Sequence, residues 1–207
     1  KMSDITNYYG FILAVIMLSI TPGADTVFIL TKSIAGGYRQ GFASVFGIVC
    51  GLFVHTMLAA FGLSVILMTS ALLFNIVKIA GAAYLIYLGI MALKSKSSIN
   101  INEDNASYSF FAVFRQGFFT NLLNPKVALF FLALLPQFVK SNVSSPVPFL
   151  ILGLTFIFIG SLWSIFLVWA SARMSNILRQ SKFSYYLNKT AGVIFIALGL
   201  NILRLKN

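Results

Sequence analysis

Acidic side chains are almost absent from this sequence. Only 4 of its 207 residues are Asp or Glu, against 15 Lys and Arg, and charged residues of all kinds make up 9% of the chain. Soluble domains carry about 25% charged residues. A chain that is 59% hydrophobic and so poor in charge cannot cover its apolar surface with a water-soluble exterior. We therefore expect an integral membrane protein.

Cysteine and histidine are equally scarce, with Cys50 and His55 the single examples of each. One cysteine excludes an intramolecular disulfide, a dithiol redox pair and a cysteine-rich metal site. The acids Asp4, Glu103 and Asp104 fall in polar ends or loops, so a Ser-His-Asp set or a metal centre lacks ligands within the apolar segments. We expect no enzyme, no catalytic residues, no cofactor and no metal site.

The net charge of +11 would suggest a nucleic-acid partner in a soluble protein. Here the cations lie between apolar runs, as they do in cytoplasmic loops beside anionic lipid. No basic patch interleaved with aromatic residues is long enough to bind nucleic acid. The expected partner is therefore the lipid bilayer, and no nucleic acid.

Six apolar segments are long enough to span a bilayer as helices, which need about 20 residues each. They cover roughly 8–31, 41–68, 71–93, 110–135, 147–170 and 185–205. A polar segment at about 94–109 separates three of them from the other three. We expect one all-α transmembrane domain over 1–207, made of one repeat at about 8–93 and a second at about 110–205.

The two halves resemble one another. The third span begins "VKIAGAAYLIYLG" at Val77, the sixth begins "NKTAGVIFIALG" at Asn188, and both carry Lys-x-Ala-Gly. The first span of each half is interrupted by a proline, at Pro22 and at Pro125. Because three spans is an odd number, the second repeat must enter the membrane from the opposite side. Interrupted helices at matching positions of inverted repeats indicate a transport site near the midplane.

The distribution of Lys and Arg predicts the orientation. One side would hold seven: Lys32, Arg39, Lys94, Lys96, Arg173, Arg179 and Lys182. The other side would hold four: Lys1, Lys140, Arg204 and Lys206. The first side is expected to be cytoplasmic, which places both termini outside.

The first interruption carries a buried acid. Pro22 removes a backbone donor, and Gly23 lets the chain unwind, although a simple kink has the same signature. Asp25 lies well inside the span, where a carboxylate costs about 2.5–3.5 kcal/mol on insertion scales. It could form a structural ion pair with a neighbouring helix. The interpretation that we favour is a ligand for a substrate amine or a proton carrier.

The second interruption carries a buried cation. Lys126 is too deep in its span to reach the interface comfortably, so it either pairs with Asp25 or captures a carboxylate. The helix that restarts at Pro125 would add a positive N-terminal dipole. Asn121 and Asn124 add donors and acceptors nearby. We expect Asp25 and Lys126 to come within contact range across a small polar chamber that binds a zwitterion.

A stripe of small residues precedes and follows His55 at intervals of four. It comprises Ala43, Gly47, Gly51, His55 and Ala59. Gly47-x-x-x-Gly51 allows close helix approach, and such a face also permits a homodimer. We interpret His55 as part of this packed face, with proton coupling as the less favoured alternative.

Three segments together resemble the LysE/RhtB amino-acid exporter family. They are "TPGADTVFILTKSIAGGYRQGF", "KIAGAAYLIYLGIMALK" and "NLLNPKVALFFLALLPQFV". The resemblance covers nearly the whole chain. The family's first motif maps to Pro22, Gly23 and Asp25, and its second to Asn124, Pro125 and Lys126. The chain departs where the family commonly has a second proline after the glycine and this sequence has Ala24.

The resemblance implies secondary-active export of amino acids or close derivatives across the bacterial cytoplasmic membrane, which we expect to be coupled to protons. A divalent-cation exporter is the runner-up, because related families move metal ions. A cation path needs several oxygen ligands, however, and Asp25 is the one acid inside a span. A thiol-redox membrane protein is disfavoured by the single Cys50. An assembly partner without transport would not need two opposite charges at membrane depth.

Overall fold

The computed structural model is entirely helical in the part of the chain that it describes, apart from one isolated β-bridge. That part comprises 4–63, 109–140, 145–178 and scattered single residues within 72–94 and 189–200. Two of its helical stretches qualify as membrane spans by length and composition, Ala24–Gly62 and Val147–Ser171, although the first has non-helical backbone angles at Gly36 and Gly37. Phe110–Leu122 and Lys126–Phe138, bent by 47° at a short break, make a third if counted as one span.

The first interruption is confirmed. Helix α1 covers Tyr8–Ile20, and α2 covers Ala24–Leu58, so the chain leaves the helical path around Pro22. Asn7 caps the start of α1, and its side chain accepts a hydrogen bond from the Gly10 amide. A π-helical turn, η2 at Ala59–Leu63, continues α2.

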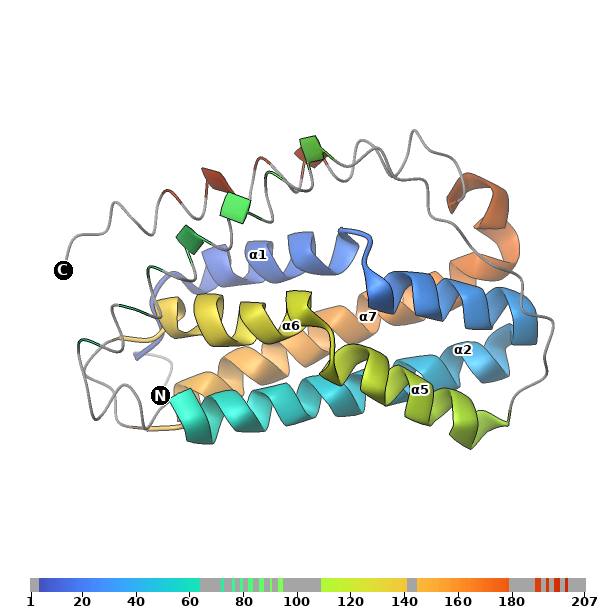
Figure 1. Ribbon diagram of the computed structural model, residues 1–207, viewed down its shortest axis with the longest axis horizontal. Coiled ribbons are helices and arrows are strands. Elements are labelled where there is room, and N and C mark those ends of the chain that lie inside the picture. The colour runs from blue at the N-terminus through green and yellow to red at the C-terminus, as the bar shows by residue number, and fades with distance from the viewer. Residues whose placement is uncertain are drawn as a thin grey trace.

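Helix α2 consists of two arms that reverse direction at Gly36 and Gly37 (Figure 1). Gly37 has a φ of 63°, a value that residues with a side chain rarely adopt. Glycine has no Cβ and adopts it without steric clash, which allows this tight turn. A Cβ at Gly41 would lie 2.5 Å from Ser33 Oγ, so residues on opposite sides of the turn are packed together. The predicted spans, 8–31 and 41–68, leave a connection between them at this place. In the structure the connection is shorter, because only Gly36 and Gly37 depart from helical backbone angles.

The second interruption is also confirmed. Helix α5 covers Phe110–Leu122 and α6 covers Pro125–Leu129. After α6 the chain tightens through η3 at Phe130–Leu134 and η4 at Leu135–Phe138. Helices α5 and α6 run in the opposite direction to α1 and the first arm of α2, with the two breaks near the middle of the molecule (Figure 1). Helix α7, Val147–Leu178, crosses behind both breaks.

The beginning of the first broken span lies beside the end of the second. The amide of Thr6 donates to the carbonyl of Phe138 at 2.8 Å, and the amide of Lys140 donates to the carbonyl of Asp4 at 3.0 Å. Ile5 and Val139 form an antiparallel bridge between these bonds. These contacts fix the ends of two oppositely directed spans on one side of the molecule.

The apolar core is rich in phenylalanine. The Phe11 ring packs edge-on against Phe138 with centroids 5.2 Å apart, and the Phe130 ring lies 5.0 Å from Phe156. Large apolar side chains are also exposed, including Phe158 at 66%. Lipid is the solvent in which such exposure carries no penalty.

The small-residue stripe of the second α2 arm packs inside the chain. A Cβ at Gly47 would lie 2.2 Å from the Phe114 carbonyl oxygen, and one at Gly51 would lie 2.6 Å from Asn121 Oδ1. Both contacts are with α5. These two glycines are therefore in contact with α5 within the chain, and a homodimer stays a prediction.

Two parts of the sequence prediction fall largely outside the described residues. These are the third and sixth spans, with their Lys-x-Ala-Gly segments, and most of the polar segment at 94–109. The protein is a multi-pass helical membrane protein. The arrangement of six helices as two inverted repeats stays a prediction.

Candidate functional site

The carbonyl of Leu18 loses its usual partner at the first break. In a continuous helix this carbonyl would accept from the amide of residue 22, but Pro22 has no N–H. Lys126 Nζ donates to the Leu18 carbonyl at 2.8 Å and to the Thr21 carbonyl at 2.8 Å. A cation at the C-terminal end of a helix also interacts favourably with the helix dipole. The buried lysine therefore completes the end of α1.

The second break has a related arrangement. The carbonyl of Asn121 lies four residues before Pro125, which likewise offers it no amide. It accepts from the Asn124 amide at 3.0 Å, and His55 Nε2 lies 3.4 Å away as a further donor. The His55 ring stacks on Phe131 with centroids 5.6 Å apart. His55 is thus packed against the break and bonded to it.

Asn124 and Pro125 restart the helix after the second break. The Asn124 side-chain oxygen accepts from the Lys126 amide at 3.0 Å, which is a standard N-terminal cap. Pro125 occupies the first helical position, where its missing N–H costs nothing. Lys126 is consequently held at the second position of α6, with its side chain directed at α1.

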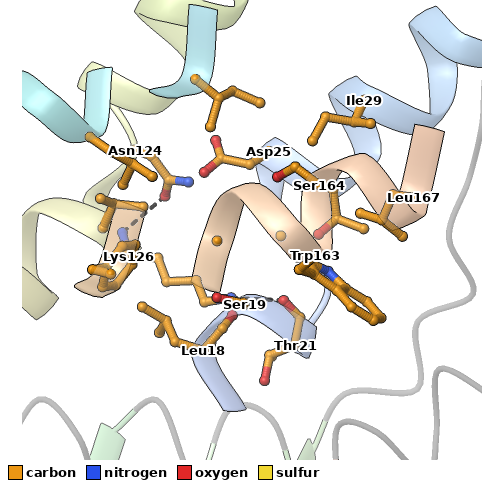
Figure 2. A pocket seen from close by; sticks show the side chains of 17 residues that line it. Leu18, Ser19, Thr21, Asp25, Ile29, Asn124, Lys126, Trp163, Ser164 and Leu167 are labelled. Carbon is orange, nitrogen blue, oxygen red and sulfur yellow. Dashed lines mark hydrogen bonds between the residues drawn. The ribbon is translucent and has the colours of Figure 1, made fainter. Parts of the chain in front are cut away.

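Asp25 holds the matching place after the first break, as the second residue of α2. A carboxylate is favoured there by the helix dipole. Its Oδ2 accepts from Asn121 Nδ2 at 2.8 Å. The amide of Asn124 lies beside the carboxylate (Figure 2). Oδ1 is buried and has no hydrogen-bond partner among the described residues.

The two charges line one cavity but do not form the expected direct contact. Each is bound instead to the half of the chain that it does not belong to: Lys126 to α1, and Asp25 to α5. The carbonyls freed by Pro22 compete for the ammonium, and the Asn121 amide competes for the carboxylate. The result is a polar centre with opposite charges on separate walls.

The cavity between the breaks has a volume of about 60 Å³, which is space for a few water molecules. From the predicted set it is lined by Gly23, Asp25, Asn124 and Lys126. Asn121 and His55 are not among its lining residues. Gly23 sits against the ammonium, because a Cβ there would lie 3.5 Å from Lys126 Nζ.

Helix α7 supplies a wall that the sequence prediction missed. It contributes Phe156, Gly160, Trp163, Ser164 and Leu167. Figure 2 shows Trp163 and Ser164 around the same space as Asp25 and Lys126. The residues recur at helical spacing, and the small and polar letters of "GSLWS" at 160–164 are a signal that could have identified this face.

No three side chains among His, Cys, Asp and Glu gather at any point within the described ranges. The cavity itself brings one carboxylate and one ammonium together. Such a pair suits a small molecule that carries both a cation and an anion or a neutral acceptor.

Comparison with known proteins identifies the family of this chain. The family model described as LysE type translocator matches residues 16–206. A homoserine/homoserine lactone efflux protein of Salmonella typhimurium is 33% identical over 192 residues, covering 93% of each chain. The uncharacterized membrane protein YrhP of Bacillus subtilis is 32% identical over 193 residues, covering 89% of this chain and 92% of its own. No solved structure matches. Because the family model covers nearly the whole chain, this protein belongs to the LysE type translocator family.

Proposed function

We propose that this protein exports a small amino acid or a close derivative from the bacterial cytoplasm by secondary-active transport. Proteins of its family are efflux translocators rather than enzymes. The observation that carries the proposal is the shared cavity of Asp25 and Lys126 at two facing helix breaks. Intramembrane charges in such a position are expensive and usually mark a transport path.

The substrate ammonium is assigned to Asp25. One carboxylate oxygen is already taken by Asn121, and Oδ1 is the buried acceptor without a partner among the described residues. A charged hydrogen bond from a primary ammonium would satisfy it. The neighbouring Asn124 narrows the position in which the ammonium can sit.

The substrate carboxylate is assigned to Lys126. An ammonium has three donors, and the Leu18 and Thr21 carbonyls take two of them. The third donor favours an anion at the same point. A homoserine-like molecule is the substrate class that the Salmonella relative supports.

Proton coupling is assigned to Asp25, because a carboxylate on the path can carry a proton in exchange for substrate. His55 is the second candidate, and its contacts with Asn121 and Phe131 make it a support for the break. A divalent-cation exporter is disfavoured, since Lys126 would repel such a cargo. We further propose two inverted repeats within a single domain, with both termini outside the cytoplasmic membrane.

The test uses inverted membrane vesicles with labelled homoserine in the external medium, where export appears as uptake. We expect uptake driven by an imposed proton gradient and abolished by Asp25→Asn or Lys126→Ala. Wild-type uptake by either variant, at matched protein levels, would remove the cavity from the mechanism. Uptake of Zn²⁺ with no uptake of any amino acid would overturn the substrate class.

A further inference from the structure

Trp163 lines the cavity and carries an unused hydrogen-bond donor. Its indole Nε1 is buried, and no acceptor meets it in the part of the chain that the structure describes. The residue lines the cavity from α7 (Figure 2). An indole N–H can only donate, and leaving it buried without an acceptor is unfavourable. An acceptor that enters the cavity would remove this penalty.

Asp25 Oδ1 presents the complementary deficit on another wall of the same cavity. It is a buried acceptor that also lacks a partner among the described residues. Much of the remaining lining is apolar, including Ile29, Leu52 and Phe156. The ligand that best fits this cavity has one cationic donor and one acceptor oxygen, separated by a small aliphatic segment.

We propose that Trp163 determines specificity by donating its indole N–H to an oxygen on the substrate side chain. This inference rests on the proposed export function and assigns one of its contacts. The carboxylate is better served by the Lys126 ammonium, which leaves the neutral indole for a neutral oxygen. A hydroxyl or a lactone carbonyl is such an oxygen.

The proposal predicts discrimination against an isostere without that oxygen. Homoserine and norvaline differ by a hydroxyl in place of a methyl group. A site that expects an acceptor rejects the apolar analogue, because its own donor is then left unpaired. Trp163→Phe keeps an aromatic ring in the wall and removes the donor. The variant should lose the preference for homoserine while norvaline is still transported.

The test uses the full-length protein in proteoliposomes, with counterflow of labelled homoserine and norvaline measured separately. We expect the homoserine-to-norvaline ratio to fall roughly tenfold in Trp163→Phe. Trp169→Phe is the matched control, because Trp169 lies further along α7, is 50% exposed and does not line the cavity. Its ratio should equal that of the wild type. An unchanged ratio in Trp163→Phe would overturn the inference.

A binding measurement keeps the inference testable if Trp163→Phe does not fold. The chain has 2 tryptophans, so Trp163 is the sole indole emitter in Trp169→Phe. Homoserine should shift or quench this emission, and norvaline should do so much less. Homoserine transport with no change in emission would overturn the role of Trp163. Absence of transport of any small amino acid by the wild type would instead refute the proposed function.

Discussion

The side-chain ammonium of Lys126 is hydrogen-bonded to the main-chain carbonyl of Leu18 at 2.8 Å. Leu18 lies four residues before Pro22, so the lysine replaces the amide that the proline removes. This relationship explains why a cation is retained deep in an apolar span. It also explains why Lys126 does not simply neutralise Asp25.

Removal of the lysine should damage both the helix end and transport. Lys126→Ala leaves the carbonyls of Leu18 and Thr21 without their donor, which costs about 1–3 kcal/mol for a buried group. We expect normal membrane insertion, lower thermal stability in detergent and loss of export. Lys126→Arg should rescue export only in part, since a planar fork does not replace a compact ammonium.

A second substitution separates the two roles of Lys126. Pro22→Ala restores an N–H that can pair with the Leu18 carbonyl. In the Lys126→Ala background it should recover stability and leave export absent. Additive losses in the double variant would show that the lysine does not compensate for the proline.

Asp25→Asn should abolish export while the protein still inserts. The amide can keep a hydrogen bond with Asn121, but it offers no charge to a substrate ammonium and carries no proton. The measurement is the rate of amino-acid efflux from dipeptide-loaded cells. In this variant the rate should be low and should not change with external pH. Retained pH-dependent efflux in this variant would move proton coupling to another residue.

Gly51→Ala should weaken export by displacing Asn121. The added Cβ would lie 2.6 Å from Asn121 Oδ1, and Asn121 holds the Asp25 carboxylate. Overpacking of this kind costs about 1–3 kcal/mol. Gly62→Ala is the control, because a Cβ there meets nothing within 4 Å among the described residues. Equal efflux rates in both variants would indicate that Asn121 does not position the carboxylate.

His55→Gln should retain much of the export activity, because its side-chain amide can still donate toward the Asn121 carbonyl. His55→Leu cannot donate and should lose stability. Efflux and melting temperature measured for both variants distinguish support of the break from proton transfer. A proton-relay role would instead make the two substitutions equally inactive.

The orientation of the protein in the membrane can be measured by the accessibility of tags. We expect a C-terminal epitope to be accessible on intact cells, as the distribution of Lys and Arg predicts. A cysteine in place of Lys140 should label from the same side as one in place of Asp4, since their backbones are hydrogen-bonded. Labelling of the C-terminal epitope only after permeabilisation would reverse the topology.

The two breaks and their charges could be predicted from sequence, because proline and a charge inside an apolar run violate the rules for a membrane span. The partners of those charges could not. A sequence shows side chains and not which main-chain carbonyls are unpaired. Lys126 is therefore expected to pair with Asp25, whereas it donates to the Leu18 carbonyl. The cavity wall of α7 was hidden because Trp163 and Ser164 sit within a long apolar segment.

The turn at Gly36 and Gly37 also bears on how the protein is made. Only two residues, Gly36 and Gly37, connect the arms of α2. This connection is too short for one arm to insert into the membrane long before the other. We therefore expect its arms to enter the bilayer together, as a helical hairpin, while the chain is being synthesised. The Asp25 carboxylate then arrives before Asn121, its later partner, exists. We expect that charge to stay in the insertion machinery or in water until the second break is translated.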